Sequence, residues 1–239
     1  MNVRKITIIG NSVALRNRPH LKEKSKNYGE LLQKKINLNA THLTLVENLA
    51  FGRATMNDLE QITDQIINSF GDIYVINIGA SDAATREIPY WFANILNRRK
   101  ETLTKKIFKG FHQYFFLKNR RFWVILRGKK SWVTAGNFEK KFEKLLITIQ
   151  HNTSGKIICL PILPPNTRVE KEVPGTTKNY DNFNKIVRKL SNKYQVCFLN
   201  LDHLSPTPHY PDGTHFSQEG NKEVAESLFH LINENYLTK

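Results

Sequence analysis

The stretch DIYVINIG, residues 72–79, decides the fold that this sequence predicts. It is short, rich in β-branched residues, almost continuously apolar, and it ends on a glycine. Such a run is typical of a central strand in a parallel sheet that helices cover on both sides. Four further runs share this character, and they lie at residues 5–10, 42–48, 156–162 and 196–201.

Longer segments with helical periodicity separate these runs. Five helices are therefore predicted, at residues 28–38, 56–70, 138–151, 180–193 and 217–236. The alternation of strands and helices predicts a three-layer α/β/α sandwich around a five-stranded parallel sheet. Because the sequence contains no internal repeat and no low-complexity linker, we expect a single domain over residues 1–239.

The composition is ordinary for a soluble globular protein, but the charge is not. Hydrophobic residues make up 40% of the 239 residues, whereas 36 Lys and Arg against 21 Asp and Glu give a net charge of +15. Such an excess concerns partners rather than fold. We expect Cys159 and Cys197, which lie in strand-like runs, to be reduced core thiols. Because there is no signal-peptide pattern and no run of ~18 apolar residues, the chain is expected to be cytoplasmic.

Residues 98–144 hold most of the positive charge. They contain 15 Lys or Arg and 3 acids, with aromatic residues interleaved. Our preferred interpretation is a helix whose apolar stripe faces the core and whose basic back is solvated. The alternative is a surface for an acidic glycan, a phosphate-bearing carrier or the inner face of an anionic membrane. The stripe consists of Leu103, Ile107, Phe108, Phe111 and Phe115.

Polar residues and glycines follow four of the predicted strands. The carboxyl ends of parallel strands meet at one edge of a sheet, where ligands gather. These loops bring to that edge Ser12, Gly52, Ser81 with Asp82, and Asp212 with His215.

Three of these residues have the chemistry of a serine nucleophile. A serine hydroxyl such as that of Ser12 becomes reactive when an imidazole accepts its proton, and the imidazole needs an acceptor that fixes its tautomer. Asp212 and His215 stand three residues apart, and Gly213 supplies a tight bend between them. One turn of chain can therefore direct the carboxylate at the imidazole.

The order and spacing of these residues resemble the SGNH (GDSL-type) serine hydrolases over nearly the whole chain. Gly10-Asn11-Ser12 stands where that family usually has Gly-Asp-Ser. The second block matches at Asn48 and Gly52, and the last block matches at Asp212, His215, Gly220 and Asn221.

The resemblance implies the flavodoxin-like SGNH fold and a role for each matched residue. Ser12 would be the nucleophile, His215 the general base and Asp212 the residue that orients it. The backbone N–H groups of Ser12 and Gly52 would form part of the oxyanion hole. The resemblance implies no cofactor.

The third block departs from the family pattern. The chain has Gly79-Ala80-Ser81-Asp82 where the family usually has Gly-x-Asn-Asp, whose Asn is the third oxyanion donor. Ser81 takes that place, and losing a preorganised donor costs ~10²–10³ in rate.

The sequence GASDAATR, residues 79–86, also resembles the Gly-x-Val-Asp-Cys-Ala-x-Arg variant of SGNH-like proteins from bacterial surface-polysaccharide gene clusters. This implies an esterase for an O-acyl, and above all an O-acetyl, group on such a polysaccharide or its precursor, with an acylated sugar, neutral or anionic, as partner. An O-acetyltransferase with the same triad and a catalytically weak glycan-binding protein are the alternatives.

The remaining polar residues give weaker predictions. Asn11, Asp82 and Arg86 are candidates for substrate binding, although Asp82 and Arg86 could instead form an i,i+4 ion pair at a helix start. The spacing of His203, His209 and His215 fits no metal-ligand pattern, so no metal is expected. The charge would suit nucleic acid, but no recognition module is present, so none is expected as a partner. The oligomeric state is not predicted.

Overall fold

The computed structural model describes residues 3–15, 26–39, 43–97 and 102–237. Its centre is a sheet of five parallel strands, as the sequence predicts, and the strand order is β2-β1-β3-β4-β5. The strands are β1 (Val3–Gly10), β2 (Leu43–Asn48), β3 (Ile73–Asn77), β4 (Lys156–Cys159) and β5 (Cys197–Phe198). Position 42 of the second predicted strand lies outside the described residues.

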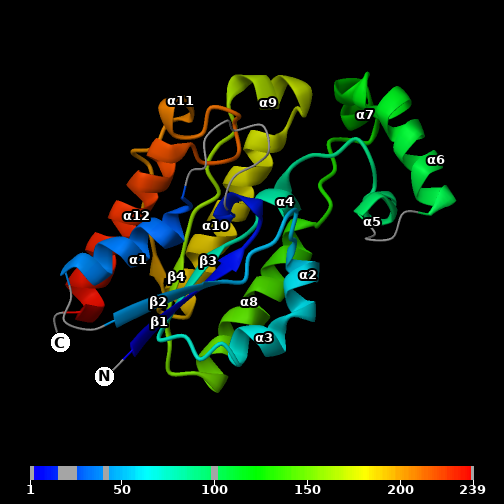
Figure 1. The fold of residues 1–239 in the computed structure, drawn as a ribbon. Helices are drawn as coiled ribbons and strands as arrows, with labels where there is room; N and C mark the ends of the chain where they lie inside the picture. Colours follow the sequence, from blue (N-terminus) through cyan, green and yellow to red (C-terminus); the bar gives the residue numbers. More distant parts are fainter. Residues whose placement is uncertain (1–2, 16–25, 40–42, 98–101, 238–239) are drawn as a thin grey trace.

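Helices cover both faces of this sheet (Figure 1). The alternation of side chains along β3 shows why: Tyr74 and Ile76 join one buried cluster, while Ile73 and Val75 join the other. The first cluster is built with α2 (Met56–Gln61), α3 (Thr63–Ile67), α8 (Ala135–Asn152) and α10 (Thr176–Lys193). The second is built with α1 (Tyr28–Asn39) and α12 (Gln218–Ile232). The three-layer α/β/α prediction is therefore confirmed.

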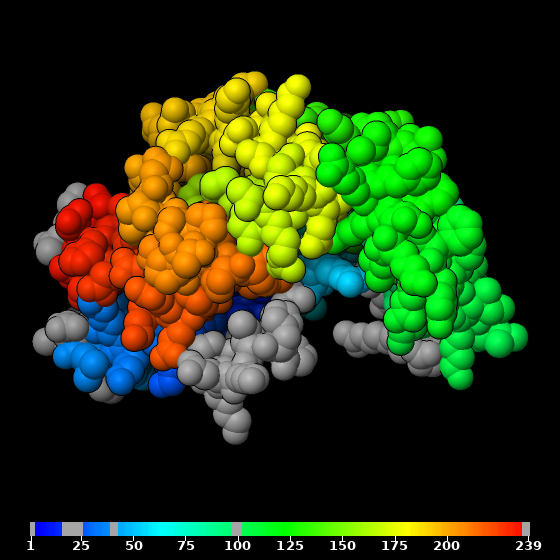
Figure 2. Space-filling model, turned by 90° about the horizontal axis from the view of Figure 1, so that it is seen from above, coloured from blue at the N-terminus to red at the C-terminus, as the bar shows by residue number. Residues whose placement is uncertain are grey.

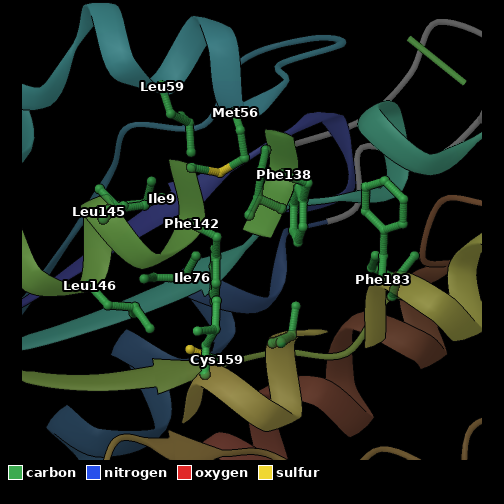
Figure 3. Close-up of a cluster of buried hydrophobic side chains, with 14 of the residues drawn as sticks. Ile9, Met56, Leu59, Ile76, Phe138, Phe142, Leu145, Leu146, Cys159 and Phe183 are labelled. Carbon is green, nitrogen blue, oxygen red and sulfur yellow. The ribbon is translucent and has the colours of Figure 1, made fainter. Parts of the chain in front are cut away.

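The first cluster is the larger hydrophobic core (Figure 3). Phe138 and Phe142 of α8 stack with ring centroids 5.5 Å apart, and Phe183 of α10 packs on Phe138 at 4.6 Å. Cys159 is buried in the same cluster and is a free thiol, as is the half-buried Cys197. Burial of aromatic side chains on this scale fixes the helices firmly to the sheet.

The helix predicted over residues 56–70 is broken into two. Ile62 lies between α2 and α3 with φ −110° and ψ 17°, outside the helical region. The last predicted helix also changes character, because α12 ends at Ile232 and continues as the π-helix η3 (Asn233–Leu237). Neither change moves the ends of the sheet.

The chain leaves this layered body at Thr85 and returns at Ser131, where the two residues form an isolated antiparallel bridge. We call the described residues between them, 86–97 and 102–130, the arm. It contains α5 (Tyr90–Asn97), α6 (Leu103–Phe111), the π-helix η2 (His112–Leu117) and α7 (Arg120–Leu126). In Figure 1 these helices stand beside the body. Residues 98–101, the start of the predicted basic segment, lie outside the described part of the chain.

The predicted core-facing stripe of α6 is wrong. Phe108 packs on Phe92 of α5, at 4.9 Å between ring centroids. The other stripe residues are exposed: Leu103 by 76%, Ile107 by 61%, Phe111 by 49% and Phe115 by 52%. The reason is that α6 has only the small cluster around Phe92 to pack on. Among the described residues, no helix has both the length and the apolar character needed to cross a membrane.

Candidate active site

The loop after β1 holds Ser12 rigidly. Strand β1 ends at Gly10, where a Cβ atom would lie 2.5 Å from the carbonyl oxygen of Asn77, so only glycine allows this approach to β3. The turn η1 (Ser12–Ala14) follows, capped by Asn11, whose Oδ1 accepts from the N–H of Val13 at 3.0 Å. Asn48 of β2 donates from Nδ2 to the carbonyl oxygen of Ala14 at 2.8 Å, which braces the turn from the neighbouring strand.

The loop before α12 holds Asp212 and His215 together. Asp212 Oδ1 accepts from the backbone N–H groups of Thr214 and His215 at 2.8 and 2.7 Å. Asp212 Oδ2 lies 2.7 Å from Nδ1 of the His215 ring. Gly213 takes a φ of +84°, in the left-handed region that favours glycine, so the bend predicted between the pair is present.

The final helix anchors this loop to the rest of the body. Ser217 caps α12 by accepting from the N–H of Gly220 at 3.0 Å. Asn221 then accepts from the N–H of Tyr28, the first residue of α1, at 2.9 Å. His215 is therefore fixed relative to a helix that packs on the sheet.

The two loops meet. Ser12 Oγ lies 3.1 Å from His215 Nε2, across 203 residues of sequence. With the Asp212 contact on the other ring nitrogen, this makes a continuous hydrogen-bonded chain of hydroxyl, imidazole and carboxylate. Burial alone would raise the pKa of Asp212, but its hydrogen bonds from His215 and the backbone hold that pKa at about 2. The carboxylate is therefore ionised at neutral pH and can stabilise an imidazolium.

A cavity of about 260 Å³ opens over this chain of residues. Asn11, Ser12, Ser81, Asp212 and His215 all line it. The site therefore gathers most of the residues that the sequence predicts for it, from loops after β1 and β3 and before α12.

The sequence pattern of the GDSL-like lipase/acylhydrolase family matches residues 8–223. The chain belongs to this family. No curated protein sequence matches it.

The solved structures that are similar to this GDSL family member include the following two. One is a lipase/acylhydrolase from Enterococcus faecalis, with 18% identity and a TM-score of 0.64 over 97% of this chain and 96% of that one. The other is Axe2, an acetylxylan esterase from Geobacillus stearothermophilus, with 17% identity and a TM-score of 0.63 over 96% and 94% of the two chains. At these identities the likeness concerns the fold.

Ser12 and Gly52, whose backbone N–H groups are predicted for the oxyanion hole of this GDSL family member, differ in position: Ser12 lines the cavity and Gly52 does not. Within the described residues, the N–H groups of Ser12 and Gly52 have no hydrogen-bond partner, so both are available as donors. However, Gly52 is exposed and does not line the cavity, whereas its neighbour Arg53 does. The oxyanion roles of Ser12, Gly52 and Ser81 stay predictions.

Asn11, one of the residues predicted to bind substrate, lines the cavity and offers a side-chain donor that the sequence did not assign to the oxyanion hole. Its side chain is 1% exposed, and its Oδ1 is used by the cap on Val13. Its buried Nδ2 has no partner in the part of the chain that the structure describes. An unsatisfied buried N–H is costly, and a ligand oxygen in the cavity would satisfy it.

The predicted role of Asp82 in substrate binding is wrong. Asp82 is fully buried, does not line the cavity, and accepts from the backbone N–H of Met56 through Oδ1 at 2.8 Å. Burial raises its pKa to about 7. Nor does it form the alternative ion pair with Arg86, because α4 (Ala80–Ala83) ends before that residue. Arg86 instead lines the cavity and lies 4.1 Å from the centroid of the Trp132 ring.

The loop histidines do not assemble a metal site. Among the described residues, no three His, Cys, Asp or Glu side chains gather in a way that could hold an ion. His209 follows Pro206 in the short helix α11 (Pro206–His209), and its Nδ1 accepts from the N–H of Ser205 at 3.0 Å. His203 is half exposed, and its Nε2 lies 3.9 Å from an oxygen of Glu223.

Proposed function

We propose that this family member is a serine esterase that removes a short O-acyl group, above all O-acetyl, from a bacterial surface polysaccharide or its precursor sugar. The observation that carries the catalytic part is the hydrogen-bonded chain Ser12–His215–Asp212, with contacts of 3.1 and 2.7 Å. In this proposal Ser12 is the nucleophile, His215 the general base and Asp212 the residue that fixes the imidazole tautomer.

The reaction runs in two halves. Ser12 Oγ attacks the acyl carbonyl carbon while His215 Nε2 takes the hydroxyl proton, and Asp212 stabilises the imidazolium. The negative oxygen of the tetrahedral intermediate accepts from the N–H of Ser12, with Ser81 and Asn11 as side-chain donors. His215 then gives its proton to the departing sugar oxygen. Water attacks the acyl-serine with His215 again as base, which releases the carboxylic acid and restores Ser12.

The cavity supports a sugar ester with a short acyl chain. Its volume of about 260 Å³ is small, and polar and charged side chains make up most of its lining. A long alkyl chain would need an apolar channel, since apolar groups gain nothing from a polar wall. Two further observations support a sugar ester. The fold is similar to that of an acetylxylan esterase, and residues 79–86 resemble the variant found in proteins from surface-polysaccharide gene clusters.

A test separates the esterase from its alternatives. Purified protein is treated with a fluorophosphonate probe and assayed on p-nitrophenyl acetate and acetylated sugars, beside Ser12→Ala and the exposed control Ser154→Ala. We expect the wild type and Ser154→Ala to be labelled and active, and Ser12→Ala to be neither. A wild type that resists the probe and hydrolyses nothing would overturn the proposal in favour of a glycan-binding protein. Acetyl transfer to an added sugar, in preference to water, would assign a transferase.

A further inference from the structure

Four guanidinium groups surround the catalytic cavity. Its lining includes Arg53, Arg86, Arg120 and Arg168, against two carboxylates. One carboxylate, that of Asp212, is engaged by His215 at 2.7 Å. The other, that of Glu172, lies 3.7 Å from Arg120 and 3.9 Å from Arg168. Arg120 also donates to the buried carboxylate of Glu87 at 3.0 Å. Even with this third carboxylate, positive charge exceeds negative charge beside the nucleophile.

Among the four arginines, Arg86 gives the strongest indication of an anion site. Its Nη2 donates to the carbonyl oxygen of Ser81 at 3.4 Å, and its guanidinium stacks on Trp132. Its buried Nε has no hydrogen-bond partner within the described ranges, and no carboxylate there lies within 4.0 Å of it. Burial, together with the nearby charges of Arg120 and Arg53, lowers the pKa of Arg86, although Tyr180 and Glu87 act in the opposite direction. A partly buried guanidinium that no carboxylate contacts directly is costly, and a bound anion would lower that cost.

The positive surface continues out of the cavity. A groove of about 720 Å³ adjoins it between α7 and α9 (Thr167–Glu172), and the two hollows share Arg120, Arg168 and Glu172. The groove adds three further cations, Lys118, Arg121 and Lys171. A substrate seated on Ser12 could therefore extend along a cationic track.

We propose that Arg86, with Arg53 and Arg120, binds an anionic group of the acylated sugar, a carboxylate or a phosphate, within the catalytic cavity. This rests on the proposed esterase function and names its substrate class. Planar guanidinium groups suit both anions because they donate two parallel hydrogen bonds. A neutral acetylated sugar can accept a hydrogen bond from Arg86 Nε but brings no counter-charge, and is therefore the poorer substrate.

The test compares three acetylated substrates: a uronic acid, a sugar phosphate, and a neutral sugar of the same ring. We expect the wild type to favour an anionic substrate by about tenfold or more in kcat/KM, mainly through KM, as befits a charge-assisted pair. Arg86→Gln should bring that ratio towards one, while Arg188→Gln, which replaces an exposed arginine on α10, should leave it unchanged. The preferred anion tells carboxylate from phosphate.

Arg53→Gln serves as a second variant if Arg86→Gln does not fold, and it should lower the ratio in the same direction. Binding of inorganic phosphate and a free uronic acid to Ser12→Ala, measured by calorimetry, gives a readout without turnover. Equal kcat/KM on the neutral and anionic substrates, together with no anion binding, would overturn the subsite. Ser12-dependent hydrolysis would in that case leave the esterase proposal standing.

A separate observation concerns the outer surface of the arm, which is both apolar and basic. Figure 2 shows the arm as a green lobe at one side of the molecule. Between residues 102 and 130 the chain carries nine Lys or Arg and no Asp or Glu. Its large exposed apolar side chains are Leu103, Ile107, Phe111, Tyr114, Phe115, Leu117, Phe122, Ile125 and Leu126.

The charge decides what covers this surface. A second copy of the chain would bring nine cations against nine, so self-association through this face is disfavoured. A nucleic acid would suit the cations and aromatic rings but would gain nothing from Leu103, Ile107, Ile125 and Leu126. An anionic lipid surface takes both kinds of side chain, since apolar groups enter the acyl boundary while Lys and Arg meet the headgroups. We infer that residues 102–126 dock the protein on an anionic membrane.

Vesicle sedimentation tests this with the full chain. We expect binding to phosphatidylcholine vesicles that contain phosphatidylglycerol, and little to pure phosphatidylcholine. The triple variant Leu103→Ser/Ile107→Ser/Phe111→Ser and the double variant Lys105→Glu/Lys106→Glu should each bind at least about tenfold more weakly. The control Lys34→Glu/Lys222→Glu carries the same charge change on α1 and α12, away from the arm, and should bind like the wild type.

Two outcomes would overturn the membrane inference. One is the absence of vesicle binding, or equal binding by the arm variants and the wild type. The other is a wild type that is a dimer in solution and a Leu103→Ser/Ile107→Ser/Phe111→Ser variant that is a monomer, which would assign the face to a second copy of the chain. In the first case, nucleic acid that competes for the arm would assign this face to nucleic acid.

Discussion

Asp82 Oδ1 accepts a 2.8 Å hydrogen bond from the backbone N–H of Met56, and so ties two loops of the active-site edge together. Asp82 stands in α4, directly after Ser81. Met56 begins α2, three residues after Arg53, which lines the cavity. A fully buried carboxylate therefore sets the spacing between these two loops, although it does not touch the cavity itself.

The Asp82→Asn variant should alter how stability depends on pH. Burial raises the pKa of Asp82 to about 7, whereas an aspartate in an unfolded chain titrates near ~3.9. Between those values the folded protein binds more protons than the unfolded chain, so the free energy of unfolding falls as pH rises. An asparagine does not titrate. The free energies of unfolding of the two proteins should differ least near pH 4. By pH 8 the unfolding free energy of the variant should have risen by a few kcal/mol relative to that of the wild type, roughly 1.4 kcal/mol for each unit of pKa shift.

Urea unfolding of both proteins at several pH values from 4 to 8 measures this difference. All other titrating groups are common to the two proteins, so their contributions cancel. A difference in unfolding free energy that stays constant over this range would show that Asp82 does not titrate there.

The Asp212→Asn variant should keep the fold and lose catalysis. An amide at this position cannot hold the His215 tautomer that leaves Nε2 free to accept from Ser12, so we expect kcat to fall by about 10⁴. Asp202→Asn, at an exposed loop position, is the matched control. Initial rates on p-nitrophenyl acetate, together with circular dichroism to check the fold, measure both. A variant that retains a tenth or more of the activity would show that Asp212 does not orient the base.

The pH profile of the wild type gives a second check on Asp212. Its pKa is held at about 2, below that of an unfolded aspartate, so the stability it contributes is present above pH ~4 and is lost as pH falls towards 2. The carboxylate is therefore charged throughout the neutral and mildly acidic range. The titration of Asp212 should therefore cause no inflection in kcat/KM of the wild type between pH 4 and 8.

Substitutions of Ser81 test whether this residue replaces the asparagine donor that the family usually has in its third block. Ser81→Asn restores the longer amide donor of the family pattern and should raise kcat on acetyl esters, by up to about 10² if that donor is the missing one. Ser81→Ala should lower kcat severalfold. Ser154→Ala serves again as the serine control. If Ser81→Asn gains nothing while Asn11→Ala loses about 10² in kcat, the buried amide of Asn11 supplies the third donor instead.

The sequence predicts the sheet and the reacting residues for the same physical reason. Ile73 to Ile76 are apolar on both faces because helices cover both faces, and that pattern is visible without coordinates. Parallel strands then bring the loops of Ser12 and Asp212 to one edge whatever lies between them. The break at Ile62 has no such local signal, and a single periodic segment is the natural prediction there.

The surroundings of the arm and the three other arginines of the cavity could not be predicted in this way. Amphipathic periodicity shows that α6 has an apolar face, but it does not show what that face meets, and the structure leaves Leu103 and Ile107 exposed. Arg53, Arg120 and Arg168 come from three separate segments, so their convergence on the cavity depends on where the arm and α9 pack. Only tertiary structure carries that information.

Glu87 ties the start of the arm to its later helices through His112 and Arg120, and its loss should loosen the arm. Its side chain is 6% exposed and accepts from Arg120 Nε at 3.0 Å, and its other oxygen lies 3.0 Å from His112 Nε2. Although burial opposes ionisation, the charge of Arg120 and these hydrogen bonds lower the pKa of Glu87. Its stabilising contribution is therefore present above the pKa of an unfolded glutamate, ~4.3, and is lost as pH falls below it.

The Glu87→Gln variant should accordingly exchange the amide hydrogens of residues 102–126 faster than the wild type, because a buried partner of Arg120 has lost its charge. The control is Glu60→Gln. Glu60 contacts Lys141 and Lys144 at 2.6 and 2.8 Å, but these pairs lie at the surface and are worth little. Hydrogen exchange at neutral pH should thus show faster exchange over the arm in Glu87→Gln and no change there in Glu60→Gln. In the wild type, acidification below pH ~4 should loosen the same amides first. If the arm of Glu87→Gln exchanges at the wild-type rate, the packing of residues 102–126 depends on other contacts, such as the aromatic cluster around Phe92.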